Sequence, residues 1–377
     1  MTILIFIIIL GILIFIHELG HFAMAKKSGV RVDEFGFGFP PRLIGLQKRG
    51  RKWKFLFWSQ KPEAGGETVY SLNLIPLGGF VKIFGEEGEG SGAKDSFVSK
   101  KARSKAAILL AGVFMNFILA VFLFGLGHFL GLPTALSDEE AAKFPDSRVA
   151  IVGVSSASPA QEAGLAAGDQ ILGYIENGRL IEIKNTAQFQ SIADRKKGQD
   201  LLLDFKRGDS QMEIKLIPRE NPPSGEGPLG VELANVAEVS YSWYESIYRG
   251  FTATISLTFA LLAAFYEIIK NLIVDGRAGM DVSGPVGIFN LTGQAAQMGF
   301  IYLIQLTALL SINLAVINAF PFPALDGGRV LFLAIEKING SPVSQKVQNL
   351  IHATGFVFLI ILMLFITYRD IAKLIGS

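Results

Sequence analysis

Two histidines and a glutamate near the start of the chain have the types and spacing of a metal site. The sequence there reads His17-Glu18-Leu19-Gly20-His21. On a helix, residues four apart share one face, so both imidazoles can reach a single ion. Glu18 stays free to accept a proton from water at that ion. The pattern predicts a hydrolytic site with zinc as its cofactor.

A third ligand is needed, because catalytic zinc normally has three protein ligands. The chain has no Cys and only four His, so the ligand must be His, Asp or Glu. His128 is expected at the wrong depth, and His352 stays an alternative. Asp326 is favoured, since a carboxylate at the end of an apolar helix is costly unless it is paired or coordinating.

The residues around Asp326 predict an irregular backbone. Pro321 and Pro323 interrupt the helix, and Gly327-Gly328 permits a close turn. At membrane depth such a backbone is tolerated only where it lines a protein cavity. Without His17 and His21, a simple boundary acid at a helix end would be the better interpretation.

Composition indicates a membrane protein. Half of the residues are hydrophobic, 18% are charged and the mean hydropathy is +0.41. The net charge of +2 gives no reason to expect a nucleic-acid partner. Four segments are long and apolar enough to span a bilayer: 2–25, 106–130, 300–320 and 353–368. The first lacks a basic start and a small-residue cleavage site, so we expect it to be retained.

Basic residues predict the orientation. They cluster between the first two apolar segments, at Lys26, Lys27, Arg49, Arg51, Lys52, Lys54, Lys100, Lys101, Arg103 and Lys105. By the positive-inside rule this loop is cytoplasmic. Both termini and the stretch 133–245 are then extracytoplasmic, and the site lies near the cytoplasmic side.

A further apolar run, 251–274, contains Glu267 and Lys270. We expect it to form an interfacial amphipathic helix within 240–276. If it crossed the bilayer, the parity of the following segments would flip. Asp326 would then lie on the opposite side from His17 and His21.

The inner loop contains two expected strands, 35–41 and 68–75, with a turn at 76–79. Unpaired backbone groups are costly beside lipid. We therefore expect a hairpin that packs on protein or lines a cavity.

The stretch 147–222 has the polarity of a soluble domain, with expected strands at 149–154, 201–206 and 212–217. Residues 158–172 predict a short helix, a turn and a strand. Within them 163–172 follows A-G-L-x-x-G-D-x-I-L, which resembles the PDZ domains of bacterial proteases. The expected fold is a polytopic α-helical membrane protein with about four transmembrane helices. It has membrane parts at 1–131 and 300–377, a membrane-associated β-hairpin and one inserted extracytoplasmic PDZ-like α+β domain.

Several motifs together resemble the site-2 protease family of intramembrane zinc metalloproteases, over nearly the whole chain. The H-E-L-G-H motif is joined by N-x-x-P-x-P-x-L-D-G-G at 318–328 and by I-P-L-G-G-[FY]-V-K at 75–82. The family's G-F-G and S-G-P segments match 36–38 and 283–285.

The resemblance implies that His17, His21 and Asp326 hold zinc and that Glu18 is the general base. It implies that Asn318 binds the substrate backbone. Gly112 and Asn116 stand where the family has A-G-P-x-x-N, with Val113 in place of the proline. An amide at Asn116 could stabilise an oxyanion or bridge helices.

The family's inner hairpin is re-entrant and lies against the substrate, which suggests strand addition to an unwound helix. The candidate residues are Gly36, Phe37, Gly38, Leu72, Asn73 and Leu74. The alternative is that these strands only brace the fold.

The expected function is cleavage of single-span membrane proteins within the bilayer of a bacterial cytoplasmic (inner) membrane. Anti-sigma factors and remnant signal peptides are the substrate types that the family implies, with membrane lipid as surroundings. One PDZ-like unit is found where well-known members carry two. The alternative is a catalytically inactive scaffold or receptor that binds extended peptides through the PDZ-like domain. A lipid hydrolase or transporter has no sequence feature of its own.

Overall fold

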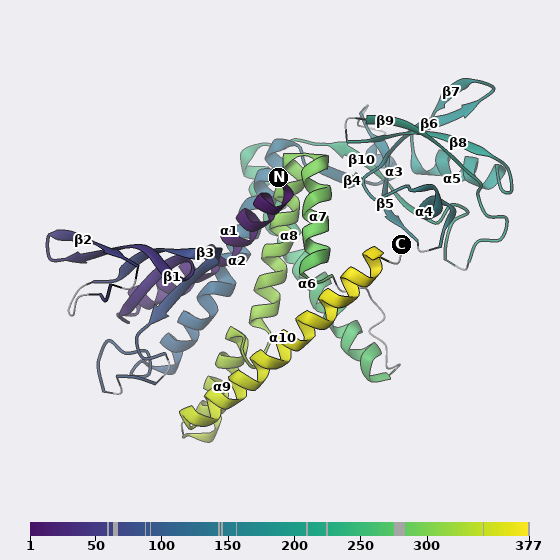
Figure 1. Ribbon diagram of the computed structural model, residues 1–377. Helices are drawn as coiled ribbons and strands as arrows, with labels where there is room; N and C mark the ends of the chain where they lie inside the picture. The colour runs from purple at the N-terminus through teal and green to yellow at the C-terminus, as the bar shows by residue number, and fades with distance from the viewer. Residues whose placement is uncertain are drawn as a thin grey trace. The chain divides into compact units, whose positions relative to one another are not determined.

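The computed structural model describes residues 1–377 except 59, 63–66, 87, 91, 142–143, 145, 156, 209, 224, 275–282, 342 and 376–377. The chain forms two compact units (Figure 1). The helical unit comprises 1–126, 247–294 and 303–377, and the sheet-containing unit comprises 127–246 and 295–302.

The helical unit is built mainly from helices. They are α1 (Thr2–Lys27), α2 (Ala102–Leu130), α6 (Trp243–Val274), α7 (Pro285–Met298), α8 (Phe300–Ala319), α9 (Asp326–Asn339) and α10 (Gln345–Ile375). Among the described residues, five helices are long and apolar enough to cross a membrane. Four correspond to the predicted segments, and the fifth is α6. Its interfacial placement stays a prediction, and residues 275–276 of the expected 240–276 segment lie outside the described residues.

Helix α7 brings the chain back to the N-terminal end of α1. The rings of Phe6 and Phe289 meet edge to face, with centroids 5.8 Å apart. A Cβ at Gly293 would lie 3.2 Å from Thr2 Cγ2. Helix α8 therefore starts at that end whatever course α6 takes. The expectation that a spanning α6 would separate Asp326 from the histidines is wrong for this reason.

A carboxylate of α10 holds the start of α7. Asp370 Oδ2 accepts hydrogen bonds from the backbone nitrogens of Gly284 and Gly287, at 2.9 and 2.8 Å. These glycines belong to the predicted S-G-P segment and its continuation. The carboxylate satisfies two of the free N–H groups that every helix N-terminus exposes.

Three strands follow α1, in the order β2-β1-β3: β1 (Val32–Arg49), β2 (Lys52–Phe57) and β3 (Val69–Ile83). Both long strands bend, so that 69–72 lies between two parts of β1. Leu72, for example, pairs with both Phe37 and Ile44. The predicted strands are confirmed. The chain also reverses direction where the turn at 76–79 was predicted: 70–72 runs parallel to 35–37, and 79–81 runs antiparallel to the same residues. Both stretches carry the label β3, and Gly78 (φ +92°) lies at the reversal.

The sheet packs on α1 through aromatic rings. Phe35 lies 5.3 Å from Phe15 and 4.6 Å from Phe22 between centroids. The outer face of β2 carries Trp53, Phe55 and Phe57, each more than half exposed. An apolar outer face of this kind suits contact with lipid rather than water.

The sheet-containing unit has seven strands in the order β4-β10-β5-β6-β8-β9, with β7 paired to β6. They are β4 (Pro133–Leu136), β5 (Arg148–Val154), β6 (Gln170–Glu176), β7 (Arg179–Glu182), β8 (Leu201–Arg207), β9 (Ser210–Leu216) and β10 (Val231–Glu238). Helices α3 (Asp138–Ala141), α4 (Pro159–Ala163) and α5 (Thr186–Arg195) accompany them. The three expected strands and the helix-turn-strand at 158–172 are present. The PDZ-like assignment stays a prediction.

Candidate metal centre

Three predicted side chains from distant parts of the chain meet at one point. His17 Nε2 lies 3.0 Å and His21 Nε2 3.3 Å from Asp326 Oδ2. The two Nε2 atoms are 3.2 Å apart. Both histidines are buried. Among the described residues, this is the one group of three metal-binding side chains close enough to share an ion.

The dimensions of this triangle fit zinc. Zinc bonds of about 2.0–2.1 Å in a tetrahedron place neighbouring donor atoms about 3.3 Å apart. The three observed separations, 3.0, 3.2 and 3.3 Å, match one face of such a tetrahedron. Two imidazoles and a carboxylate are also a ligand set of catalytic zinc sites, in which the fourth position takes water.

Two glycines let α2 approach the metal-binding face of α1. A Cβ at Gly20 would lie 2.6 Å from the Ala111 backbone carbon. A Cβ at Gly112 would lie 2.7 Å from His17 Cε1. Both distances are far inside van der Waals contact, so glycine is required at both positions.

The same approach orients His21. Its Nδ1 donates a hydrogen bond to the Ile108 carbonyl oxygen at 2.8 Å. A proton held on Nδ1 leaves the Nε2 lone pair free for a metal.

Asp326 is placed by the proline-glycine turn and begins α9, which joins the ends of α8 and α10 (Figure 1). Ala324 has a left-handed backbone (φ +77°), and its N–H donates to His352 Nδ1 at 2.9 Å. His352 therefore braces the turn and lies outside the ligand group. Glycine at 327 and 328 leaves room for the carbonyls of Ala319 and Phe322.

Asp326 is an anion. Burial raises the pKa of its carboxyl, but hydrogen bonds and charge from His17 and His21, when these rings are protonated, outweigh burial and give a net pKa of about 2. A carboxylate that is ionised at neutral pH is ready to bind a cation.

A cavity of about 450 Å³ opens on the site, lined by Glu18, His21, Asp326 and residues 79–83 of β3. The backbone of Val81 is a hydrogen-bond partner of Glu18. Among the described residues, 79–83 pairs with β1 alone. The free edge of the sheet therefore faces the cavity and the glutamate.

Three of the predicted hairpin residues lie inside the sheet. Gly36 and Phe37 pair on both sides because 35–37 lies between two parts of β3, and Leu72 does so because 69–72 lies between two parts of β1. Buried Asn73 donates to the Gly38 carbonyl oxygen at 2.9 Å, and the side chain of Leu74 is half exposed. Gly36, Phe37 and Leu72 therefore offer no free edge to a substrate, whereas 79–83 does.

The remaining predicted residues are placed as follows. Asn318 is half-buried in the last turn of α8. Asn116 is fully buried on the Nδ1 side of His17. His128 belongs to the sheet-containing unit, with its ring 5.8 Å from that of Tyr241.

Sequence reasoning missed an ion pair beside the cavity, between Glu86 and Arg329. Both residues line the cavity, and the pair joins the segment after β3 to α9. Burial lowers the pKa of Arg329, and the charge of Glu18 raises it. No motif or spacing links residues so far apart in the sequence.

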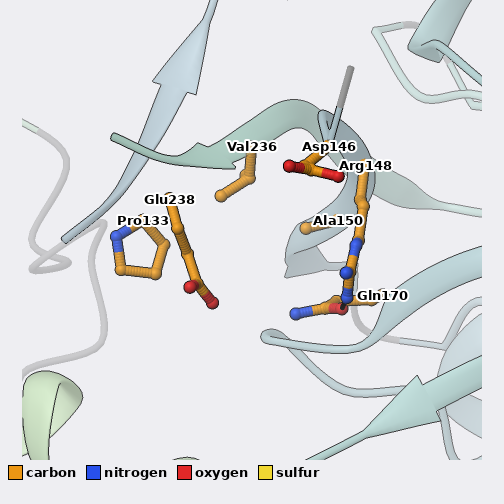
Figure 2. Close-up of a pocket in the computed structure, with 7 residues that line it drawn as sticks. All are labelled: Pro133, Asp146, Arg148, Ala150, Gln170, Val236 and Glu238. Atoms are coloured by element: carbon orange, nitrogen blue, oxygen red, sulfur yellow. Dashed lines mark hydrogen bonds between the residues drawn. The ribbon is translucent and has the colours of Figure 1, made fainter. Parts of the chain in front are cut away.

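A second polar hollow, of about 360 Å³, lies on the sheet-containing unit (Figure 2). Arg148 donates to Gln170 Oε1 at 3.1 Å, and Asp146 and Glu238 add carboxylates. Its charged groups are of both signs, and Asp146 and Arg148 are exposed. It lacks the converging ligands of the site on α1.

Comparison with known proteins agrees with this geometry. The model of peptidase family M50 matches residues 5–66 and 59–362. A Clostridium perfringens protein whose name includes the words zinc metalloprotease is 35% identical over 361 residues, with 95% of each chain covered.

Two further relatives align over almost their whole length. Zinc metalloprotease RasP of Oceanobacillus iheyensis is 28% identical, covering 99% of both chains. The regulator of sigma-E protease RseP of Escherichia coli is 28% identical, covering 98% of both. With a family match over most of its length, the chain belongs to peptidase family M50 and is a membrane zinc metalloprotease.

Proposed function

We propose that this protein is an endopeptidase that cuts single-span membrane proteins within the bilayer, near its cytoplasmic side. The observation that carries the proposal is the triangle of His17, His21 and Asp326 beside Glu18 in one cavity. Anti-sigma factors and remnant signal peptides are the proposed substrate types. Both termini and the sheet-containing unit are proposed to be extracytoplasmic.

The residues divide the chemistry among them. His17, His21 and Asp326 would hold zinc, which when bound lowers the pKa of water and polarises a carbonyl. Glu18 accepts the proton of the attacking water and passes it to the leaving amine. The free edge at 79–83 pairs with the unwound substrate, replacing the hydrogen bonds that its helix loses. We propose that Asn318 contacts the substrate backbone.

The sheet-containing unit is proposed to be a single PDZ-like filter. The Escherichia coli relative aligns over 460 positions although this chain has 377 residues, so that relative contains segments without a counterpart here. A single unit should exclude bulky ectodomains less strictly than a tandem pair. Cleavage of matched substrates with long and short ectodomains tests this, and equal strictness in the two proteins would contradict it.

The central test uses the purified full-length protein, a model transmembrane substrate and metal analysis. Glu18→Gln should retain zinc and lose cleavage by about 10²–10⁴-fold, the usual contribution of a general base. Asp326→Ala should lose both zinc and cleavage. Full cleavage by Glu18→Gln would refute the proposed mechanism.

The alternative is an inactive scaffold that binds extended peptides. A scaffold of this kind does not require the observed arrangement, in which two imidazoles and a carboxylate lie within 3.3 Å of one another beside a cavity lined by Glu18. A wild-type protein that binds peptide but cleaves no membrane substrate with zinc bound would favour it.

A further inference from the structure

Helix α2 forms the wall behind both histidines. Its residues 108, 112 and 116 recur every four positions and therefore share one face. The carbonyl oxygen of Ile108 accepts from His21 Nδ1. Gly112 faces both rings, since a Cβ there would meet His21 Nε2 and His17 Cε1. Asn116 Nδ2 lies 3.3 Å from His17 Nδ1. The Nδ1 atom of each imidazole therefore meets a polar group of α2, and each Nε2 lies beside Asp326.

The side chain of Asn116 is fully buried, and only one of its two polar atoms has a hydrogen-bond partner among the described residues. Its exposed fraction is 0%, and its Oδ1 has no hydrogen-bond partner among the described residues. A neutral His17 that offers Nε2 to a metal carries its proton on Nδ1. An amide NH₂ facing that N–H would set donor against donor.

A half-turn of the amide removes the conflict between the two donors. It exchanges Nδ2 and Oδ1 at the same two positions, which puts the carbonyl oxygen on the Nδ1 proton of His17. Nδ2 then takes the position at which Oδ1 has no partner. The preference for this orientation therefore comes from the contact with His17.

We infer that Asn116 is a positioning residue that accepts the Nδ1 proton of His17 and so fixes the tautomer whose Nε2 binds zinc. The inference rests on the zinc site of the proposed function. It replaces the expected contact of Asn116 with substrate or oxyanion, because the amide lies on the Nδ1 side of the ring while Asp326 lies on the Nε2 side.

The two histidines are thus held by different means. His21 relies on a backbone carbonyl, which no substitution at Ile108 removes. His17 relies on a side chain, so its orientation depends on residue 116. The link from Asn116 to α8 is separate, since Ser311 Oγ donates to the backbone oxygen of Asn116 at 2.8 Å. Ser311→Ala therefore removes the bridge between the helices without changing the amide.

The test measures zinc affinity of the full-length protein by chelator competition in a Glu18→Gln background, so that proteolysis plays no part. Asn116→Leu should weaken zinc binding about 10–100-fold, the usual effect of losing an outer partner of a ligating histidine. Asn116→Asp keeps an acceptor and should bind zinc at least as tightly as the parent. Ser311→Ala should match the parent. The visible spectrum of the cobalt-substituted protein should shift in Asn116→Leu alone.

Unchanged affinity and cobalt spectrum in Asn116→Leu would overturn the inference, as would an Asn116→Asp protein as weak as Asn116→Leu. Should Asn116→Leu fail to fold, Asn116→Ala carries the same expectations and the same refutation. If the Glu18→Gln parent itself binds no zinc, the proposed zinc site fails, and the inference fails with it. If the parent binds zinc and Asn116→Leu binds it equally tightly, the role of Asn116 is refuted, whereas the proposed zinc site stands.

Discussion

The Asp169 side chain and the Oδ2 atom of Asp326 are buried, one in each unit, and their surroundings differ. Asp169 accepts from Arg207 Nε and Nη2 at 2.6 Å each and from the Ala166 backbone nitrogen at 2.8 Å. Both of its oxygens face donors. Asp326 Oδ2 instead faces two imidazole nitrogens, and the hydrogen bond of His21 Nδ1 leaves its Nε2 without a proton in the neutral ring.

The difference separates a structural acid from a ligand. A buried carboxylate whose oxygens all meet donors is satisfied by the protein and stabilises the fold. A buried carboxylate that faces nitrogen lone pairs has no such partner, and a cation must supply the missing charge. In the sheet-containing unit, the guanidinium of Arg207 supplies the positive charge beside Asp169. The hydrogen bond with Asp169 raises the pKa of Arg207.

The sharpest test of this contrast is the same substitution at both positions. Asp326→Asn should weaken zinc binding by more than about 100-fold, because it removes a charged ligand. Asp169→Asn should leave zinc affinity unchanged. Chelator competition measures both, and loss of zinc in Asp169→Asn would erase the distinction.

Gly112 and Gly164, one in each unit, allow the same substitution to be compared at the proposed metal site and away from it. Gly112→Ala should weaken zinc binding about tenfold or more, since the new Cβ would lie 2.7 Å from His17 Cε1 and displace the imidazole. Gly164, which ends α4 with φ +86°, has open space around its Cα. Gly164→Ala should cost about 1 kcal/mol of stability through backbone strain and leave zinc unaffected. Equal zinc affinities in the two variants would refute the close approach of α2.

Asp169→Asn should affect the stability of the sheet-containing unit alone. Arg207 is partly exposed and recovers water as a partner, so the cost should be about 1–3 kcal/mol. Hydrogen–deuterium exchange of the full chain should show faster exchange in 164–176 and 201–207 and no change around α1. A uniform change in both units would show that their stabilities are not independent.

The sequence was sufficient for the parts of the site that local spacing determines. The spacing of His17 and His21 specified one face of a helix, and the cost of an acid beside apolar residues pointed to Asp326. The short strands predicted at 149–154, 201–206 and 212–217 correspond to β5, β8 and β9.

What the sequence did not supply is pairing between distant segments. Alternation found strand residues at 68–75 but not that this stretch pairs on both sides, so the free edge at 79–83 was missed. The turn at Pro76 and the glycines after it was predicted, but not its close contact with α1: a Cβ at Gly78 would lie 2.6 Å from Ile14 Cβ. The brace from His352 and the ion pair of Glu86 with Arg329 likewise depend on tertiary contact alone.

The separation of the ligands along the chain has a consequence for biosynthesis. His17 and His21 precede Asp326 in the sequence and leave the ribosome before it. A nascent or truncated chain that stops before α9 therefore carries the general base but lacks one of the three proposed metal ligands. Hydrolytic activity then requires that α9 has been synthesised, without any inhibitor or propeptide being required for the delay.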